Sequence, residues 1–212
     1  MTECTLSEDK IRKLNRDLRI LIATNGTLTR ILSVLANDEI VVQIISQRIH
    51  DVTPNVPEFD HLAVGRVLQR DILLKGRRSG RPFVAAESLI AIDLLPAAIT
   101  TSFLETDRPI GEVMAASRIE SFKEEAKVWA GELPGWIELD GYRNSQTETI
   151  ARRYRVITEA QPALIITEYF LQSVFEDDLR EESDRRQHSS DIDMRSGDRF
   201  VHRDRIPSRP WR

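Results

Sequence analysis

The chain has 212 residues, 41% of them hydrophobic, with a net charge of −4 and a pI near 5.7. This size allows one domain with a sizeable core, and the lack of basic excess argues against a general nucleic-acid binder. No apolar run approaches the roughly 20 residues of a membrane span. The N-terminus lacks the pattern of a secretory signal, and Cys4 is the only cysteine. We therefore expect a cytoplasmic protein with no disulfide within the chain, no nucleic-acid partner and no membrane contact.

The first half of the chain predicts one helix and three strands. Residues 7–23 carry apolar side chains at helical spacing, and Asn25 and Gly26 follow as a stop signal. Residues 40–49 are rich in β-branched side chains and predict a strand. Residues 67–74 and 83–90 predict two more strands, which the turn at 75–82 should join into a hairpin.

The second half predicts two helices and another hairpin. A short helix should begin at Pro96 and run to about Leu104. A second helix is indicated by apolar side chains at Ile119, Phe122, Ala126 and Trp129. Residues 150–158 and 163–171 predict strands that pair around the turn at 159–162. Strands joined by short turns favour an α+β fold with one antiparallel sheet and the helices gathered on one side.

The composition changes near Glu176. Residues 176–212 hold ten acidic and nine basic residues, with few apolar side chains and no sustained periodicity. Such a segment buries too little surface to offset its ordering entropy. We therefore expect a folded domain over residues 1–175 and a charged, mobile tail over residues 176–212.

Two charged residues lie where apolar ones are expected. Strand side chains alternate between faces, so Glu168 shares its face with Leu164, Ile166 and Phe170. Arg70 is likewise placed among aliphatic side chains of its strand. A buried charge normally finds a partner, shifts its pKa or belongs to a site. These two residues are therefore the first candidates for a functional site.

Both residues also allow a purely structural interpretation. A turn symmetric about Arg78 and Ser79 would place Arg70 opposite Glu87, which predicts a cross-strand ion pair. Glu168 could in the same way be neutralised by one of three arginines on its partner strand: Arg152, Arg153 or Arg155. An arginine held by one carboxylate would still have donors free for a second.

Six segments, in order and with compatible spacing, carry a family resemblance. They are GTLTR (26–30), LQRDILL (68–74), AAES (85–88), RPIG (108–111), RRYR (152–155) and ITEYFL (166–171). Between about residues 6 and 175 the chain resembles the chorismate pyruvate-lyases. It looks most like the stand-alone 4-hydroxybenzoate synthases of actinobacteria that make phenolic glycolipids.

The resemblance implies a carbon–oxygen lyase that converts chorismate into 4-hydroxybenzoate and pyruvate. It implies one antiparallel sheet with a ligand cavity under helical flaps, and no cofactor or metal. By motif, Arg70 matches the arginine that binds the product carboxylate, and Glu168 matches the acid near its hydroxyl. The N–H of Ile110 matches a flap contact, and Leu28 matches an apolar wall residue. Glu87 departs from the pattern, since the better-known bacterial enzyme has arginine there.

Chorismate carries two carboxylates, so the site needs a second cation besides Arg70. Four further arginines are candidates for it: Arg30, Arg118, Arg153 and Arg155. Glu168 could act as a general base toward the ring hydrogen or as a general acid toward the leaving group, and the sequence leaves both roles open.

Two non-enzymatic functions compete with the lyase. One is a sensor of small aromatic acids, because effector domains of some bacterial transcription regulators have a chorismate-lyase-like fold. Such regulators carry a DNA-binding domain in front, and only about 25 residues precede the first motif here. The other is an assembly protein that binds a partner through the charged tail. The presence of both Arg70 and Glu168 favours the enzyme.

Overall fold

The computed structural model describes residues 4–59, 64–137 and 149–171. The predicted tail, residues 176–212, lies outside the described residues. One antiparallel sheet forms the centre of the domain, with the strand order β1-β6-β7-β8-β4-β3-β2 and with β5 paired to β7. This α+β architecture confirms the predicted fold class. No helix in the described ranges has the length and apolar character needed to cross a membrane.

The N-terminal region differs from the single predicted helix. After β1 (Cys4–Thr5) come α1 (Glu8–Lys13) and α2 (Arg16–Ala23), which are separated at Leu14 and Asn15. The break is stabilised by Asn15, whose side chain accepts a 2.7 Å hydrogen bond from the Leu18 N–H and caps α2. Helix α2 ends just before Asn25 and Gly26, as expected. An additional helix, α3 (Leu28–Ala36), then leads into β2 (Ile40–His50).

The central hairpin is formed by β3 (Val67–Gly76) and β4 (Pro82–Ala91). The turn is held by Asp38, which accepts hydrogen bonds from the backbone N–H groups of Arg78 and Ser79. The predicted pairing of Arg70 with Glu87 is wrong. Lys75 pairs with Pro82 as a symmetric turn requires, but a register shift between Leu74 and Lys75 then offsets the strands by one residue. Arg70 therefore lies opposite Ser88, and Glu87 lies opposite Asp71 on the other face.

The second hairpin matches the prediction closely. Strands β7 (Thr149–Thr158) and β8 (Gln161–Phe170) pair around a two-residue turn at Glu159 and Ala160. Both turn residues have positive φ, which suits the twist of a tight hairpin. Glu168 pairs with Arg152 on β7 and with Ala86 on β4, so it occupies the middle of the sheet.

Of the two helices predicted after β4, the structure contains the first and not the second. The short 3-10 helices η1 (Pro57–Phe59) and η2 (Ile92–Leu94) flank the β3–β4 hairpin in sequence, and α4 (Ala97–Glu105) is the expected short helix. Helix α5 (Ile110–Ser117) follows. The helix predicted around residues 119–129 does not form. Instead β5 (Ser121–Lys123) and β6 (Lys127–Gly131) both pair with β7.

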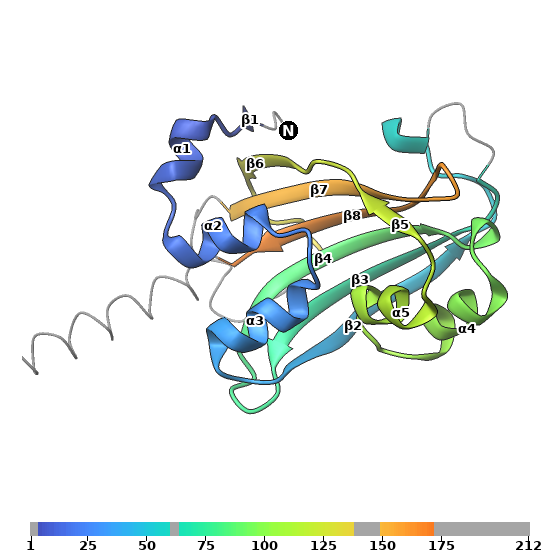
Figure 1. Cartoon of the computed structure of the whole chain (residues 1–212), viewed down its shortest axis with the longest axis horizontal. Helices are drawn as coiled ribbons and strands as arrows, with labels where there is room; N and C mark the ends of the chain where they lie inside the picture. The colour runs from blue at the N-terminus through green and yellow to red at the C-terminus, as the bar shows by residue number, and fades with distance from the viewer. Residues whose placement is uncertain (1–3, 60–63, 138–148, 172–212) are drawn as a thin grey trace, which may run out of the picture. The chain divides into compact units, whose positions relative to one another are not determined.

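Four helices cover one face of the sheet in two groups. Helices α2 and α3 lie over one end, and α4 and α5 over the other (Figure 1). Each group packs on the same sheet face and forms a hydrophobic cluster with it. The cluster under α2 and α3 contains Leu21, Leu32 and Phe170, and the cluster under α4 and α5 contains Phe103 and Leu164. The opposite face carries a smaller cluster under η1. The two clusters on the helical face leave a space between them, where the candidate site lies.

Candidate active site

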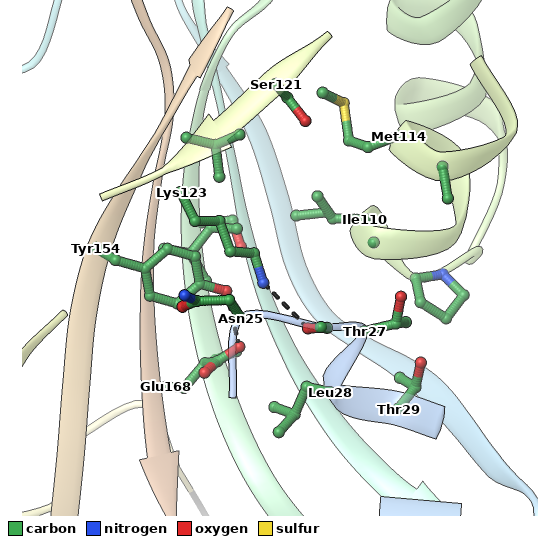
Figure 2. Close-up of a pocket in the computed structure, with 18 of the residues that line it drawn as sticks. Asn25, Thr27, Leu28, Thr29, Ile110, Met114, Ser121, Lys123, Tyr154 and Glu168 are labelled. Atoms are coloured by element: carbon green, nitrogen blue, oxygen red, sulfur yellow. Dashed lines mark hydrogen bonds between the residues drawn. The ribbon is translucent and has the colours of Figure 1, made fainter. Parts of the chain in front are cut away.

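A cavity of about 490 Å³ lies between the sheet and the two helix groups. Its floor is made by strand side chains, among them Ile72, Ala86 and Ile166. Its cover comes from the α2–α3 loop, the start of α5 and strand β5. Figure 2 shows Ile110 and Met114 on one side and Lys123, Tyr154 and Glu168 on the other. Most of the wall is therefore apolar, with the polar groups gathered at particular points.

Glu168 lines this cavity and is only 5% exposed. Its Oε2 accepts a 2.5 Å hydrogen bond from Arg152 Nε, and its Oε1 accepts a 3.1 Å bond from the Tyr154 hydroxyl. Of the three arginines considered as partners, the structure selects Arg152, because it lies directly opposite Glu168 across the β7–β8 pair. The ion pair orients the carboxylate without covering it, so one side still faces the cavity.

Arg152 also holds α2 against the sheet. Its Nη1 donates to the carbonyl oxygens of Leu21, Ile22 and Thr24 at distances of 2.6, 2.9 and 3.0 Å. These are acceptors at the C-terminal end of α2, which a cation stabilises. The guanidinium thus connects the carboxylate at the cavity with the helix that forms part of its cover.

The Tyr154 ring is in contact with two cations. The guanidinium of Arg152 is 5.3 Å from the ring centroid, and Lys123 Nζ is 4.9 Å from it. Burial raises the pKa of the Tyr154 hydroxyl well above its usual value, with a further contribution from the Glu168 charge. The hydroxyl therefore stays protonated and acts as a hydrogen-bond donor to Glu168.

Arg70 is 2% exposed and has no carboxylate partner among the described residues. Its Nη2 donates to the Thr106 carbonyl at 3.2 Å, and its buried Nε has no acceptor there. Burial lowers the pKa of Arg70, and the charge of Asp107 partly offsets this. Arg70 is not itself a lining residue of the cavity. It lies on the same sheet face, two residues along β3 from Ile72 and opposite Ser88, and both of these residues line the cavity. A buried cation with unused donors suits the binding of an anion.

Besides Glu168, three predicted residues line the cavity: Leu28, Ile110 and Arg118. Leu28 begins α3 and is buried, whereas Arg118 ends α5 in a left-handed conformation and is exposed. The Ile110 N–H at the start of α5 has no acceptor within the described part of the chain. Beside it, a Cβ on Gly111 would approach Thr27 Cγ2 to 3.2 Å. The start of α5 therefore meets the α2–α3 loop closely.

The remaining four predicted residues do not line the cavity. Arg30 is exposed on α3. Glu87, Arg153 and Arg155 lie on the opposite face of the sheet, because they occupy the alternate positions of their strands. Arg153 pairs with Glu58 at 2.6 Å and Arg155 pairs with Glu124 at 2.6 Å. Burial raises the pKa of Glu87, and Asp71 raises it further. We do not propose these four as substrate ligands.

The sequence analysis missed Lys123 and Tyr154 as site residues and left Arg152 as one of three options. Tyr154 and Arg152 could have been found from the hairpin register, since both share the face of Glu168. Lys123 had no such signal, because its segment was interpreted as a helix. The part of the chain that the structure describes contains no group of three or more His, Cys, Asp or Glu side chains that could hold a metal ion.

The fold and the site define a class of protein: an α+β domain with a cavity on one sheet face, a buried acid that lines it and a buried arginine on the same face. Comparisons with known proteins give the family. The family model described as "Chorismate pyruvate-lyase Rv2949c-like" matches residues 22–176. The chain belongs to this chorismate pyruvate-lyase family, and it is a carbon–oxygen lyase.

Two relatives are similar over most of their length. The chorismate pyruvate-lyase of Mycobacterium leprae is 62% identical over 206 residues, which cover 97% of this chain and 98% of the relative. That of Mycobacterium tuberculosis strain CDC 1551 is 64% identical over 197 residues, covering 92% and 99%. Among solved structures, gene product SA0254 of Staphylococcus aureus is 9% identical with a TM-score of 0.51, covering 71% of this chain and 90% of that one. At this identity the likeness concerns the fold alone.

Proposed function

We propose that the cavity binds chorismate and that the enzyme converts it into 4-hydroxybenzoate and pyruvate. The observation that carries this proposal is the arrangement of Glu168 and Arg70 on one face of the sheet. Two strand spacings and two residue rises separate them, which places their Cα atoms roughly 12 Å apart. A six-membered ring with substituents at opposite ends can lie between their side chains.

In this arrangement Arg70 binds the ring carboxylate. Its guanidinium has donors without acceptors among the described residues, and burial strengthens a charge-assisted bond to a carboxylate. The Ile110 N–H adds a donor from the cover, and Leu28 contacts the ring from the opposite side. The apolar floor around Ile72 suits the ring itself.

Glu168 then lies near the ring carbon that bears the hydroxyl group, and it acts as the general base. Its contacts with Arg152 and the Tyr154 hydroxyl fix the orientation of the carboxylate, and its cavity side is placed to accept a proton. Glu168 removes the hydrogen of that carbon as a proton, and the electron pair of the C–H bond forms the third double bond of the ring. The ether C–O bond breaks with its electron pair on oxygen, which releases the enolate of pyruvate.

The proton balance closes at Glu168. The protonated carboxyl returns its proton to the methylene carbon of the enolate, which yields pyruvate and regenerates the carboxylate. Formation of the aromatic ring supplies the driving force, so this scheme uses no redox cofactor. The cover formed by α5 and the α2–α3 loop lies over the reacting atoms and limits the access of water to them.

Several finer assignments belong to the same proposal. We propose that 4-hydroxybenzoate made here is a precursor of phenolic glycolipids, following the similarity to the actinobacterial enzymes. We also propose that residues 1–175 form the catalytic domain and 176–212 a tail outside it, which the family match to residues 22–176 supports. Location in the cytoplasm stays a prediction from the sequence.

The test is to incubate the purified protein with chorismate in EDTA and to measure 4-hydroxybenzoate and pyruvate together. We expect equal amounts of both products. Glu168→Gln removes the base but keeps the size of the side chain, so turnover should fall by about 10²–10⁴-fold. Tight binding of 4-hydroxybenzoate without any conversion of chorismate would instead identify a sensor of small aromatic acids.

A further inference from the structure

Lys123 is a polar cavity residue with no role in the proposed scheme so far. It is the last residue of β5, which pairs with β7 at the edge of the cover. Its Nζ donates a 3.2 Å hydrogen bond to the Gly26 carbonyl and lies over the Tyr154 ring. Figure 2 shows the Lys123 side chain directed into the cavity on the same side as Glu168. The ammonium group is therefore beside the acid that removes the proton.

The charge of Lys123 is not neutralised by a salt bridge within the described residues. The charge of Glu168 acts on Lys123, but that carboxylate is already bonded to Arg152 and Tyr154. Burial lowers the pKa of Lys123, while Glu168 raises it and Arg152 lowers it further. An ammonium has three hydrogens, and one of them is used by Gly26. The remaining donors are available to an anion in the cavity.

The geometry of the substrate indicates which anion this is. Glu168 must approach the ring carbon that bears the hydroxyl, and the carbon that bears the enolpyruvyl ether is its neighbour in the ring. The ether group therefore lies at the Glu168 end of the cavity, far from Arg70. Lys123 is the cation at that end which is not already paired, whereas Arg118 is exposed and screened by solvent.

We infer that the Lys123 ammonium binds the enolpyruvyl group of chorismate and stabilises the negative charge that develops on its ether oxygen as the C–O bond breaks. This inference rests on the proposed function. Lys123 keeps its proton throughout, and the atoms and electrons move as described for Glu168. The interaction strengthens as charge develops, so it contributes to the rate as well as to binding.

A contact between Lys123 and the enolpyruvyl group would distinguish the substrate from one of its products. Chorismate carries the enolpyruvyl group, whereas 4-hydroxybenzoate does not. Loss of the charge at position 123 should therefore impair chorismate turnover and leave the affinity for 4-hydroxybenzoate nearly unchanged. A residue that merely supports the cover would affect both ligands alike.

The experiment compares Lys123→Gln, Lys123→Arg and the control Lys127→Gln. Lys127 is exposed on β6 and lies opposite Arg153, on the other face of the sheet. For each variant kcat/KM for chorismate, the Kd of 4-hydroxybenzoate and the thermal unfolding temperature are measured. Removal of one preorganised donor should lower kcat/KM of Lys123→Gln by about 10²–10³-fold. The Kd of 4-hydroxybenzoate should stay within about threefold, as expected for a group that does not contact it.

Lys123→Arg keeps the charge and should retain more activity than Lys123→Gln, while Lys127→Gln should behave like the wild type. Normal turnover by Lys123→Gln beside an active wild type would overturn the inference and leave the proposed function intact. An equal loss of affinity for 4-hydroxybenzoate would also overturn it. A wild-type enzyme that releases neither product would overturn both.

Discussion

Arg152→Met should be among the most destabilising single changes at the site. The Arg152 and Glu168 side chains are 2% and 6% exposed, and their ion pair is 2.5 Å long. The substitution leaves the buried carboxylate without its cation and also removes the donor to three carbonyl oxygens at the end of α2. Breaking a buried pair on one side costs about 3–5 kcal/mol. Total stabilities are about 5–15 kcal/mol, so the variant should be folded but markedly weaker.

A double-mutant cycle isolates the ion pair from the helix contacts. Glutamine at position 168 carries no charge and needs no cation, so Glu168→Gln should relieve part of the cost of Arg152→Met. We expect a coupling free energy of about 1–3 kcal/mol between the two sites. The contacts of Arg152 with α2 are lost in both the single and the double variant and therefore cancel in the cycle.

The assay is urea unfolding at constant pH and salt, followed by far-UV circular dichroism. The matched control is the Arg153–Glu58 pair, which at 2.6 Å is similarly short but whose side chains are 25% and 19% exposed. For Arg153→Met and Glu58→Gln the coupling should be only about 0.2–1 kcal/mol, because water screens the pair. A coupling for the buried pair no larger than that of the control would refute the reasoning.

Two further predictions concern Arg70 and Asp38. Arg70→Met removes a buried cation that lacks a carboxylate partner among the described residues, so the free energy of unfolding should be kept or increased. KM for chorismate should rise about 10–100-fold through loss of a charged hydrogen bond. With Arg48→Met as the control variant, a loss of stability with unchanged KM would contradict this prediction. Hydrogen bonding to the Ser79 backbone, with further bonds from Arg78, lowers the pKa of Asp38 from 3.8 to about 2. The ionised form therefore stabilises the fold above pH 3.8 and loses this effect as the pH falls toward 2. Asp38→Asn should be less stable than the wild type at neutral pH, and the difference should shrink over that acidic range in a series of urea titrations.

The two charges that drew attention in the sequence could be found because strand alternation is a local property. Glu168 and Arg70 interrupt apolar faces, and both are almost fully buried. Their partners depend on register, which is not local. In the β3–β4 hairpin the register of the two strands shifts between Leu74 and Lys75. The residues next to this shift are apolar on both faces of the sheet, so the sequence shows no polar–apolar alternation from which the shift could be recognised. Sequence reasoning therefore identified Arg70 but assigned Glu87 to the wrong face.

In the region that follows α5, the local sequence pattern predicted the wrong type of secondary structure. Apolar residues at Ile119, Phe122, Ala126 and Trp129 satisfy a helical spacing, but short segments fit more than one period. The long strand β7 supplies a partner for both β5 and β6, and pairing with it overrides the local pattern. Lys123 was missed for this reason, since only the strand places it at the cavity.

The charges of the site bear on how the products leave. Glu168 neutralises Arg152. In the proposed scheme this leaves the buried Arg70 and the half-buried Lys123 as the cations that would bind the two carboxylates of chorismate. While both anions belong to one molecule, each contact holds the other in place and the combined binding exceeds that of either alone. Cleavage of the C–O bond separates the two carboxylates, so in this scheme 4-hydroxybenzoate would keep only the contact with Arg70, and pyruvate only the contact with Lys123. The reaction therefore lowers the affinity of the site for what it contains. Pyruvate has the smaller apolar surface and should leave first.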